Sequence, residues 1–373
     1  MTDVFVVSDS VISPLGSTSA DNFMQLERSI SGVRRHDNSA ISPQPFYAAL
    51  FTGDNFASDN PYTKFEQLLI ASIKDALQNT DIVTSDEKTI LIISSTKGNI
   101  GLLETEGYNH ALEKRISLNT SANMVASHLN FINKPLVVCH ACISGLLAII
   151  TALRLIKSGI YENAVIAGAD VITKFILSGF QSFQALSPGI CKPFDAERDG
   201  INLGEGAATV IVSSNKRYAN NIKLRSGSVN NDANHISGPS RTGEELCLVI
   251  DKALTEAGVS AAEIDFISAH GTATIYNDEM EAQAIALAGL QNSPVNSMKA
   301  YFGHTLGAAG LLESAMTIQS MQRNTVLPSL GFTNIGVTKP INICNTLMHM
   351  SLDNCLKTAS GFGGCNAAVV FSK

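Results

Sequence analysis

The sequence contains no tryptophan, and aromatic residues make up only 6% of its 373 residues. Charged residues are also scarce, at 16%, and leave a net charge of −7. This weakly acidic balance provides no basic surface for nucleic acid or for an anionic membrane. So few charges predict instead that partner subunits cover part of the surface.

Targeting and membrane signals are missing as well. The amino-terminal residues MTDVFVVSDSVIS have no basic region and are typical of a first strand, not of a signal peptide. No apolar run reaches the roughly 18 residues that span a bilayer. The seven cysteines are odd in number and scattered, which suits a reducing compartment better than a disulfide scaffold. We therefore expect a cytoplasmic protein without a membrane span.

Hydrophobic residues, by contrast, make up 45% of the chain, enough for a large core. Strand-like and helix-like segments alternate throughout, which predicts α/β layers with largely parallel sheets. A second set of such segments begins near residue 222. The expected elements include strands at 4–7, 89–94, 164–167, 207–212, 264–268, 341–347, 355–359 and 367–371, and helices at 20–30, 61–78, 174–184, 243–257, 279–287 and 306–321.

The stretch PLVVCHACISGLLAIITALRLIKSG, residues 135–159, predicts a short strand at 136–138, a tight turn and an apolar helix at 144–157. Cys142 stands at the start of this helix, where free backbone N–H groups and the positive end of the helix dipole meet. That position predicts a lowered thiol pKa and a reactive thiolate. The alternative is that Cys142 is a small core residue, the usual role of a buried cysteine.

Cys139 and Cys142 have the spacing of half a zinc site or of a redox dithiol. No second pair of cysteines or histidines completes a tetrahedral set, so we expect no metal. The dithiol stays open because both thiols lie within one turn, although packing is the simpler role for Cys139.

One internal similarity relates the two parts of the chain. The helix CISGLLAIITALRL, from Cys142, can be laid over GAAGLLESAMTIQS, from Gly307, so that SGLL matches AGLL. Each helix follows a turn that holds a histidine, His140 or His304. This match predicts a duplicated α/β unit with two related helices packed in the middle.

Three glycine-rich segments carry polar groups directly after strand-like runs, where side chains are often presented to ligands. They are AHGTATIYND with His270, SMKAYFGHTLGAAG with Lys299 and His304, and SGFGGCNAAVV with Phe362. Either histidine alone fits a structural role as well as a catalytic one. Together with the cysteine at a helix start, they favour a covalent thiol mechanism.

These motifs resemble the β-ketoacyl-[acyl-carrier-protein] synthases, the decarboxylating condensing enzymes of the thiolase superfamily. The resemblance extends over nearly the whole chain, from VISPLG at 11–16 through HACISG and KPFDAERDGINLGEGAATVIV to GFGGCN. It implies a thiolase-like fold of layers α-β-α-β-α, built from two duplicated halves. Residues 1–221 would carry the nucleophile, and residues 222–373 the two histidines and the lysine.

The resemblance also implies a reaction. Cys142 matches the nucleophile that takes the acyl chain from acyl carrier protein, before decarboxylative Claisen condensation with malonyl carrier protein gives the 3-oxoacyl product. His270 and His304 match the histidines that promote malonyl decarboxylation and stabilise the enolate. Lys299 matches the family's catalytic lysine, within the elongating, Cys-His-His type.

Further residues are implied to support these four. Glu313 and Asp278 match carboxylates that orient the polar network. The backbone N–H groups of Cys142 and Phe362 would form the oxyanion hole, with Phe362 also a gate. Thr272 and Thr274 match residues that hydrogen-bond the phosphopantetheine arm. No metal or organic cofactor is implied, since the carrier protein's phosphopantetheine holds the substrates.

The partners implied are acyl carrier protein and a second subunit, identical in a homodimer or related in a heterodimer. A non-catalytic subunit resembling a chain length factor is the alternative function, and the retained Cys142 argues against it. Several residues depart from the family pattern, including His140, Ile143 and Cys365. These departures favour a specialised polyene or polyketide-like pathway over primary fatty-acid elongation.

Overall fold

The computed structural model describes residues 2–52, 56, 60–78, 80–234 and 238–373. Ten strands form one mixed sheet in the order β11-β10-β14-β15-β9-β1-β8-β6-β4-β5. Its middle is a weak junction, because β1 (Phe5–Ile12) and β9 (Lys223–Asn231) meet near their ends, where Phe5 pairs with Lys223. The sheet therefore divides into two halves of five strands each.

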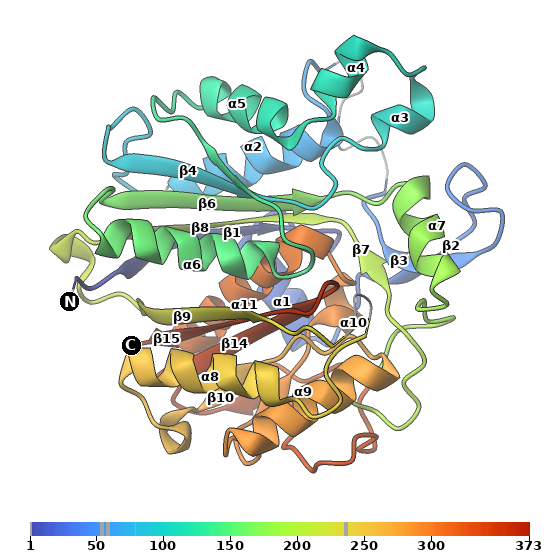
Figure 1. The fold of residues 1–373 in the computed structure, drawn as a ribbon, viewed down its shortest axis with the longest axis vertical. Helices are drawn as coiled ribbons and strands as arrows, with labels where there is room; N and C mark the ends of the chain where they lie inside the picture. Colours follow the sequence, from blue (N-terminus) through green and yellow to red (C-terminus); the bar gives the residue numbers. More distant parts are fainter. Residues whose placement is uncertain (1, 53–55, 57–59, 79, 235–237) are drawn as a thin grey trace.

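The amino-terminal half-sheet is covered on its outer side by two helices (Figure 1). Its inner side faces the middle of the molecule and packs on the central helix α6. This layer consists of β5 (Leu136–Val138), β4 (Thr89–Ser94), β6 (Asn163–Asp170), β8 (Gly206–Ser213) and β1, and its outer helices are α2 (Lys64–Leu77) and α5 (Leu118–His128).

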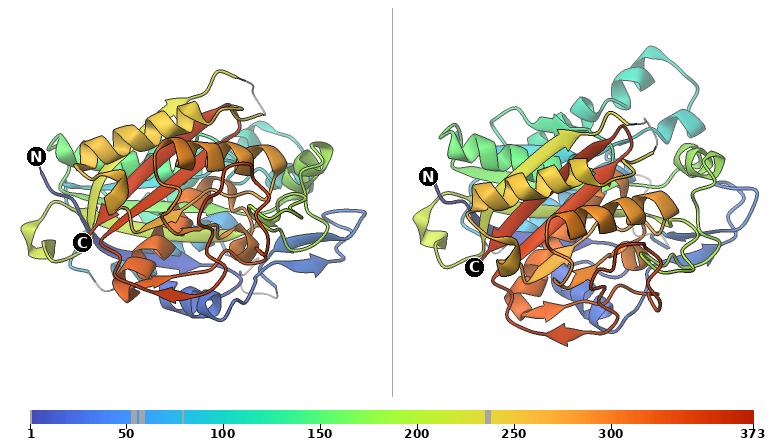
Figure 2. Two further views of the ribbon diagram at one scale, coloured as in Figure 1. Left: turned by 90° about the horizontal axis from the view of Figure 1, so that it is seen from below. Right: turned by 60° about the horizontal axis from the view of Figure 1, so that its bottom comes forward.

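The carboxy-terminal half-sheet repeats this arrangement, with two helices on its outer face, as Figure 2 shows from below. It consists of β9, β15 (Cys365–Ser372), β14 (Asn354–Gly361), β10 (Phe266–Ser268) and β11 (Val295–Asn296), covered by α8 (Glu244–Ala257) and α9 (Ile275–Leu287). Helices α6 (Ser144–Lys157) and α11 (Ala309–Arg323) lie between the half-sheets. The predicted layers α-β-α-β-α are confirmed.

The two central helices touch at the glycines of the matched SGLL and AGLL segments. A Cβ atom on Gly145 would lie 2.5 Å from the backbone nitrogen of Leu311, and one on Gly310 would lie 2.9 Å from that of Leu146. Real Cβ atoms do not approach backbone atoms this closely, so the crossing requires glycine on both helices. The internal similarity therefore reflects a backbone contact at the centre of the molecule.

The prediction of largely parallel sheets was wrong. Strand β4 runs parallel to β5 and β6, and β10 to β11 and β14, but the strands between them pair antiparallel. The alternation of strand-like and helix-like segments does not show whether the chain crosses over to a parallel strand or returns directly as an antiparallel one. At 362–364 the chain reverses directly from β14 into β15, through Gly363 and Gly364 at φ +86° and +76°.

The strand expected at 341–347 is also absent. Ile343 forms one isolated bridge with Val295, and the next strand, β13 (Met348–His349), pairs instead with β12 (Thr325–Val326). The last expected helix begins as a 3-10 turn, η3 (Leu306–Ala308), before α11.

A smaller lobe beside one end of the half-sheets contains α7 (Lys174–Ser182) and a three-stranded sheet of β2 (Arg34–His36), β3 (Phe46–Ala49) and β7 (Leu203–Gly204) (Figure 1). The remaining elements are short: α1 (Ser19–Glu27), α3 (Leu102–Thr105), α4 (His110–Arg115), α10 (Lys299–Phe302), η1 (Lys216–Tyr218) and η2 (Ala261–Glu263). Among the described residues, no helix has the length and apolar character needed to cross a membrane.

Candidate active site

Cys142 stands in a tight turn between β5 and α6. Ala141 adopts φ +44°, a left-handed conformation that is uncommon for a residue other than glycine. The Ser144 hydroxyl stabilises this turn: it accepts a hydrogen bond from the His140 N–H at 2.7 Å and donates one to the Ala141 carbonyl at 2.7 Å. The turn presents the Cys142 side chain to a cavity of about 390 Å³.

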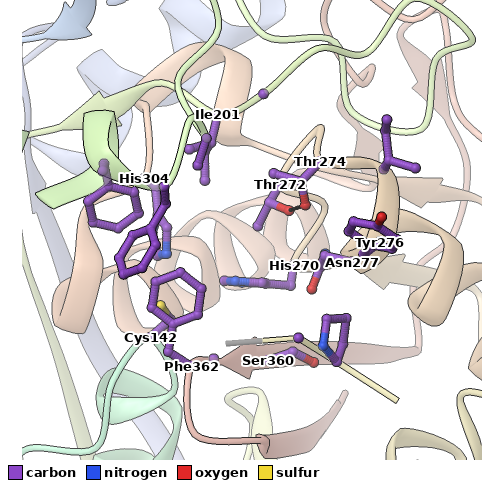
Figure 3. Close-up of a pocket in the computed structure, with 18 of the residues that line it drawn as sticks. Cys142, Ile201, His270, Thr272, Thr274, Tyr276, Asn277, His304, Ser360 and Phe362 are labelled. Carbon is purple, nitrogen blue, oxygen red and sulfur yellow. Dashed lines mark hydrogen bonds between the residues drawn. The ribbon is translucent and has the colours of Figure 1, made fainter. Parts of the chain in front are cut away.

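Two histidines from the other half of the chain reach the same cavity. His270 follows β10, and His304 lies between α10 and η3. The Cys142 sulfur and a nitrogen of each imidazole lie within 4.8 Å of one another, and both rings point toward the cysteine (Figure 3). The ring centroids are 5.2 Å apart with the planes at 82°. The structure thus brings Cys142 together with residues 128 and 162 positions later in the sequence.

The hydrogen bonds assign the same tautomer to both imidazoles. His304 Nδ1 accepts from the Leu306 N–H at 3.2 Å, which places the proton on Nε2, a buried atom with no partner among the described residues. His270 Nδ1 faces the Lys299 ammonium at 3.5 Å, so its proton also belongs on Nε2. Burial, reinforced by the nearby Lys299 cation, holds the pKa of both histidines well below the usual value. Two neutral N–H donors are therefore available at neutral pH.

Lys299 and Glu313 form a buried ion pair behind His270. The Lys299 ammonium also donates to the His270 carbonyl at 3.0 Å. Since Glu313 projects from α11, the pair connects the histidine segment to the central helix. The sequence predicted both residues, and they lie together.

Asp278 stands apart from that pair. Its carboxylate accepts from the backbone N–H groups of Thr272 at 2.9 Å and Phe194 at 2.7 Å, and burial raises its pKa to about 7. It fixes the loop that presents Thr272 to the cavity, where the Thr272 and Thr274 hydroxyls lie 2.8 Å apart (Figure 3).

Glu281 was not among the predicted site residues, yet it binds the His270 segment more directly than Asp278 does. Its carboxylate accepts from the backbone N–H of His270 at 2.8 Å and that of Gly271 at 2.6 Å. Glu281 follows Asp278 by three positions, one helical turn on the same face of α9. That spacing was the available signal.

Phe362 lies at the turn between β14 and β15 and is 42% exposed. Its ring stacks on Phe180 with centroids 6.1 Å apart and meets Phe183 edge-on at 5.6 Å. Both partners belong to the α7 region and line the same cavity, and neither was among the predicted site residues. Figure 3 shows the Phe362 ring beside Cys142. An aromatic cluster therefore covers the thiol.

The lowered thiol pKa predicted for Cys142 was wrong. Burial raises its pKa to about 12, Cys365 and Asp170 raise it further, and Lys299 together with the Phe362 backbone N–H counteracts them only in part. The helix begins at Ser144, two positions beyond the cysteine, so its free N–H groups do not enclose the sulfur. Cys142 is therefore a protonated thiol at neutral pH.

This protonation state predicts how Cys142 reacts with iodoacetamide. Because only the thiolate reacts, the alkylation rate should rise about tenfold per pH unit from pH 7 to pH 9 with no plateau. Quenched samples can be digested and the Cys142 peptide quantified by mass spectrometry. The exposed Cys139 provides an internal comparison within the same turn. A Cys142 rate that is level across this range would show a lowered pKa instead.

The distances alone would let Cys142, His270 and His304 hold a metal ion. Metal ligation requires the lone pair of an imidazole nitrogen, and here both cavity-facing Nε2 atoms carry a proton. Reversing the tautomer of His304 would set an N–H against the Leu306 N–H. The donor set thus fits hydrogen-bond donation to a substrate better than it fits a metal.

The fold and the site together define a thiolase-like condensing enzyme, with one thiol and two imidazole donors in a covered cavity. The family profile described as beta-ketoacyl synthase, N-terminal domain, matches residues 1–217, and that of the C-terminal domain matches residues 223–333. This chain belongs to the β-ketoacyl synthase family, as the sequence predicted.

Individual relatives agree. The 3-oxoacyl-[acyl-carrier-protein] synthase 2 of Vibrio cholerae is 28% identical and is aligned over 99% of both chains. A β-ketoacyl synthase from Burkholderia phymatum superposes with a TM-score of 0.89 at 25% identity, covering 100% of both chains. A chain of the complex between the ketosynthase ApeO and its chain length factor ApeC, from Xenorhabdus doucetiae, has the same fold, with a TM-score of 0.85 at 23% identity over 100% of this chain and 98% of that one.

Proposed function

We propose that this chain transfers an acyl group from acyl carrier protein to Cys142 and then condenses it with malonyl carrier protein to give the 3-oxoacyl product. The convergence of the Cys142 sulfur with His270 and His304 within 4.8 Å supports this proposal most directly. A non-catalytic partner would have no need for a thiol and two protonated Nε2 atoms aimed at one point.

In the first step the Cys142 sulfur attacks the thioester carbonyl, and the bond to the carrier's pantetheine sulfur breaks. The backbone N–H groups of Cys142 and Phe362 would stabilise the oxyanion, since the Phe362 N–H already reaches the Cys142 sulfur. Because its pKa is about 12, the Cys142 thiol is still protonated when the substrate binds. Its proton must leave during the attack and end on the departing pantetheine sulfur.

In the second step the malonyl thioester loses CO₂, and negative charge develops on its carbonyl oxygen. The Nε2–H groups of His270 and His304 would donate to that oxygen and stabilise the enolate. The enolate carbon then attacks the acyl carbonyl on Cys142, the carbon–sulfur bond breaks, and the thiol is restored on protonation. Lys299 donates to the His270 carbonyl and thereby holds the His270 segment in place during both steps.

The remaining roles concern access. Thr272 and Thr274 would hydrogen-bond the phosphopantetheine arm, because both line the cavity ahead of the histidines. Phe362 would act as the gate, since its ring must leave the aromatic cluster before an acyl chain can pass. All chemical steps are assigned to side chains and backbone N–H groups, with no metal or organic cofactor.

A second subunit is also part of the proposal. Strand β5 ends the sheet, and its Leu136 is 38% exposed, as expected of an edge strand that pairs with another chain. The ketosynthase ApeO assembles with a chain length factor, so a related partner is as reasonable as an identical one. The cytoplasmic location stays a prediction.

Acyl transfer can be tested by incubating the protein with acyl carrier protein thioesters and measuring its mass. We expect one acyl adduct, located on the Cys142 peptide after digestion. Saturated and polyene chains of several lengths should compete in the same reaction, so that the mass of the trapped group reports the preferred substrate. If no adduct forms with any chain, the enzymatic proposal fails.

A further inference from the structure

Lys357 is a charged residue in the middle of a buried strand. It lies in the segment NCLKTASG of β14, and its side chain is fully buried. Fully buried lysines are rare unless paired, because a buried ammonium must recover the hydration that it loses. None of the functions proposed above uses this residue. A lysine in the middle of a strand that the sequence pattern predicts to be buried was a signal that the sequence already contained.

The Lys357 ammonium contacts the backbone that leads into His270. It donates to the carbonyls of Ser268 and Ala269, each at 3.1 Å, and to that of Thr358 at 2.8 Å. Lys299 takes the next carbonyl, that of His270, at 3.0 Å. Three successive carbonyls before and at the histidine therefore face two ammonium groups.

The two lysines also share one carboxylate. Lys357 Nζ lies 2.7 Å from Glu313 Oε2, and Lys299 pairs with Oε1. Glu281 provides a second carboxylate nearby: its oxygens accept from the backbone N–H groups of His270 and Gly271. Burial raises the pKa of Glu281, and these hydrogen bonds together with Lys357 counteract that rise in part. Two lysines thus balance two glutamates behind the imidazoles.

The charged and titratable groups around His270 come from every element packed against it. Neutral His304 faces its ring, and the Cys142 thiol lies across the cavity. The others are Lys299 of α10, Lys357 of β14, Glu281 and Asp278 of α9, and Glu313 of α11. Without Lys357, this set would keep one ammonium, that of Lys299, beside three carboxyl groups where the enolate must form.

We propose that Lys357 is a positioning residue for the decarboxylation step. It fixes the strand end that aims His270, and it adds a second ammonium beside Lys299 that disfavours positive charge on the buried imidazoles. A protonated imidazole would carry a proton on Nδ1 as well. The Nδ1 of His304 already faces the Leu306 N–H, and that of His270 already faces the Lys299 ammonium. Protonation would therefore turn both rings away from the substrate oxygen. This inference rests on the function proposed above.

The test compares Lys357→Met with wild type in malonyl decarboxylation and in acyl transfer to Cys142, from pH 5 to pH 9. Loss of the cation should raise the pKa of both histidines, so the acid limb of the decarboxylation profile should move up by about one pH unit. Decarboxylation at neutral pH should fall about tenfold or more, while acyl transfer changes less than about threefold.

Lys157→Met is the matched control, because the Lys157 ammonium also donates to a backbone carbonyl, that of Arg225 at 2.8 Å, far from the site at the end of α6. Lys157→Met should leave the pH profile of malonyl decarboxylation unchanged. If Lys357→Met does not fold, Lys357→Gln keeps an N–H donor without the charge and carries the same test. An unshifted acid limb, or equal loss of both steps, overturns the role of Lys357. Absence of decarboxylation by wild type would instead overturn the proposed function.

Discussion

The Cys142→Ala variant is expected to lose condensation by about 10⁴-fold or more, since no acyl-enzyme can form without the sulfur. Malonyl decarboxylation should persist at a measurable rate, because the two imidazole donors lie on segments that the substitution leaves in place. Product formation and CO₂ release can be followed in the same reaction mixture. The expected result is CO₂ without 3-oxoacyl product.

Cys139→Ala is the matched control for that variant. Cys139 lies three positions earlier in the same turn, is exposed, and makes one weak contact, from its sulfur to the Thr96 carbonyl at 3.9 Å. It should retain condensation within about twofold, as is usual for a surface substitution. Equal loss in both variants would favour the dithiol interpretation, and an acyl adduct surviving in Cys142→Ala would show that another group is the acceptor.

Replacing His304 by alanine should separate the two steps. We expect malonyl decarboxylation to fall by about 10² to 10³-fold, the usual cost of removing one donor to a developing oxyanion. Acyl transfer should remain within about tenfold of wild type, because its oxyanion is stabilised by backbone N–H groups. Stopped mixtures analysed for CO₂ and for the Cys142 adduct give both rates.

His349→Ala serves as the comparison, since His349 is exposed and bonds Thr325 at the far strand pair β12–β13. It should affect neither step. If His304→Ala slows acylation as much as decarboxylation, the imidazole also takes part in removing the thiol proton. The tautomer assigned from the Leu306 N–H would then be incorrect.

Local pattern predicted the regular elements well where they are apolar and buried. The structure places β4 at 89–94 and α6 at 144–157, the bounds that the sequence indicated. The strand at 341–347 failed for a physical reason. Ile341 and Ile343 pack on the α8 and α9 side of the core, but the segment bonds to its neighbour β11 only at Val295 and forms no continuous ladder. Pairing depends on a partner distant in sequence, which a local pattern does not contain.

The sequence by itself determined which side chains could perform the chemistry: Cys142, His270, Lys299 and His304 lie in motifs that resemble those of one family. Only the tertiary structure decided their protonation and their support. The thiol is protonated because the fold encloses its sulfur, and the imidazoles are neutral chiefly because they are buried. They donate from Nε2 because Lys299 and the Leu306 N–H face their Nδ1 atoms. Solvation and distances of a few ångströms set these properties. These properties depend on contacts between segments far apart in the chain, so a local sequence pattern does not predict them.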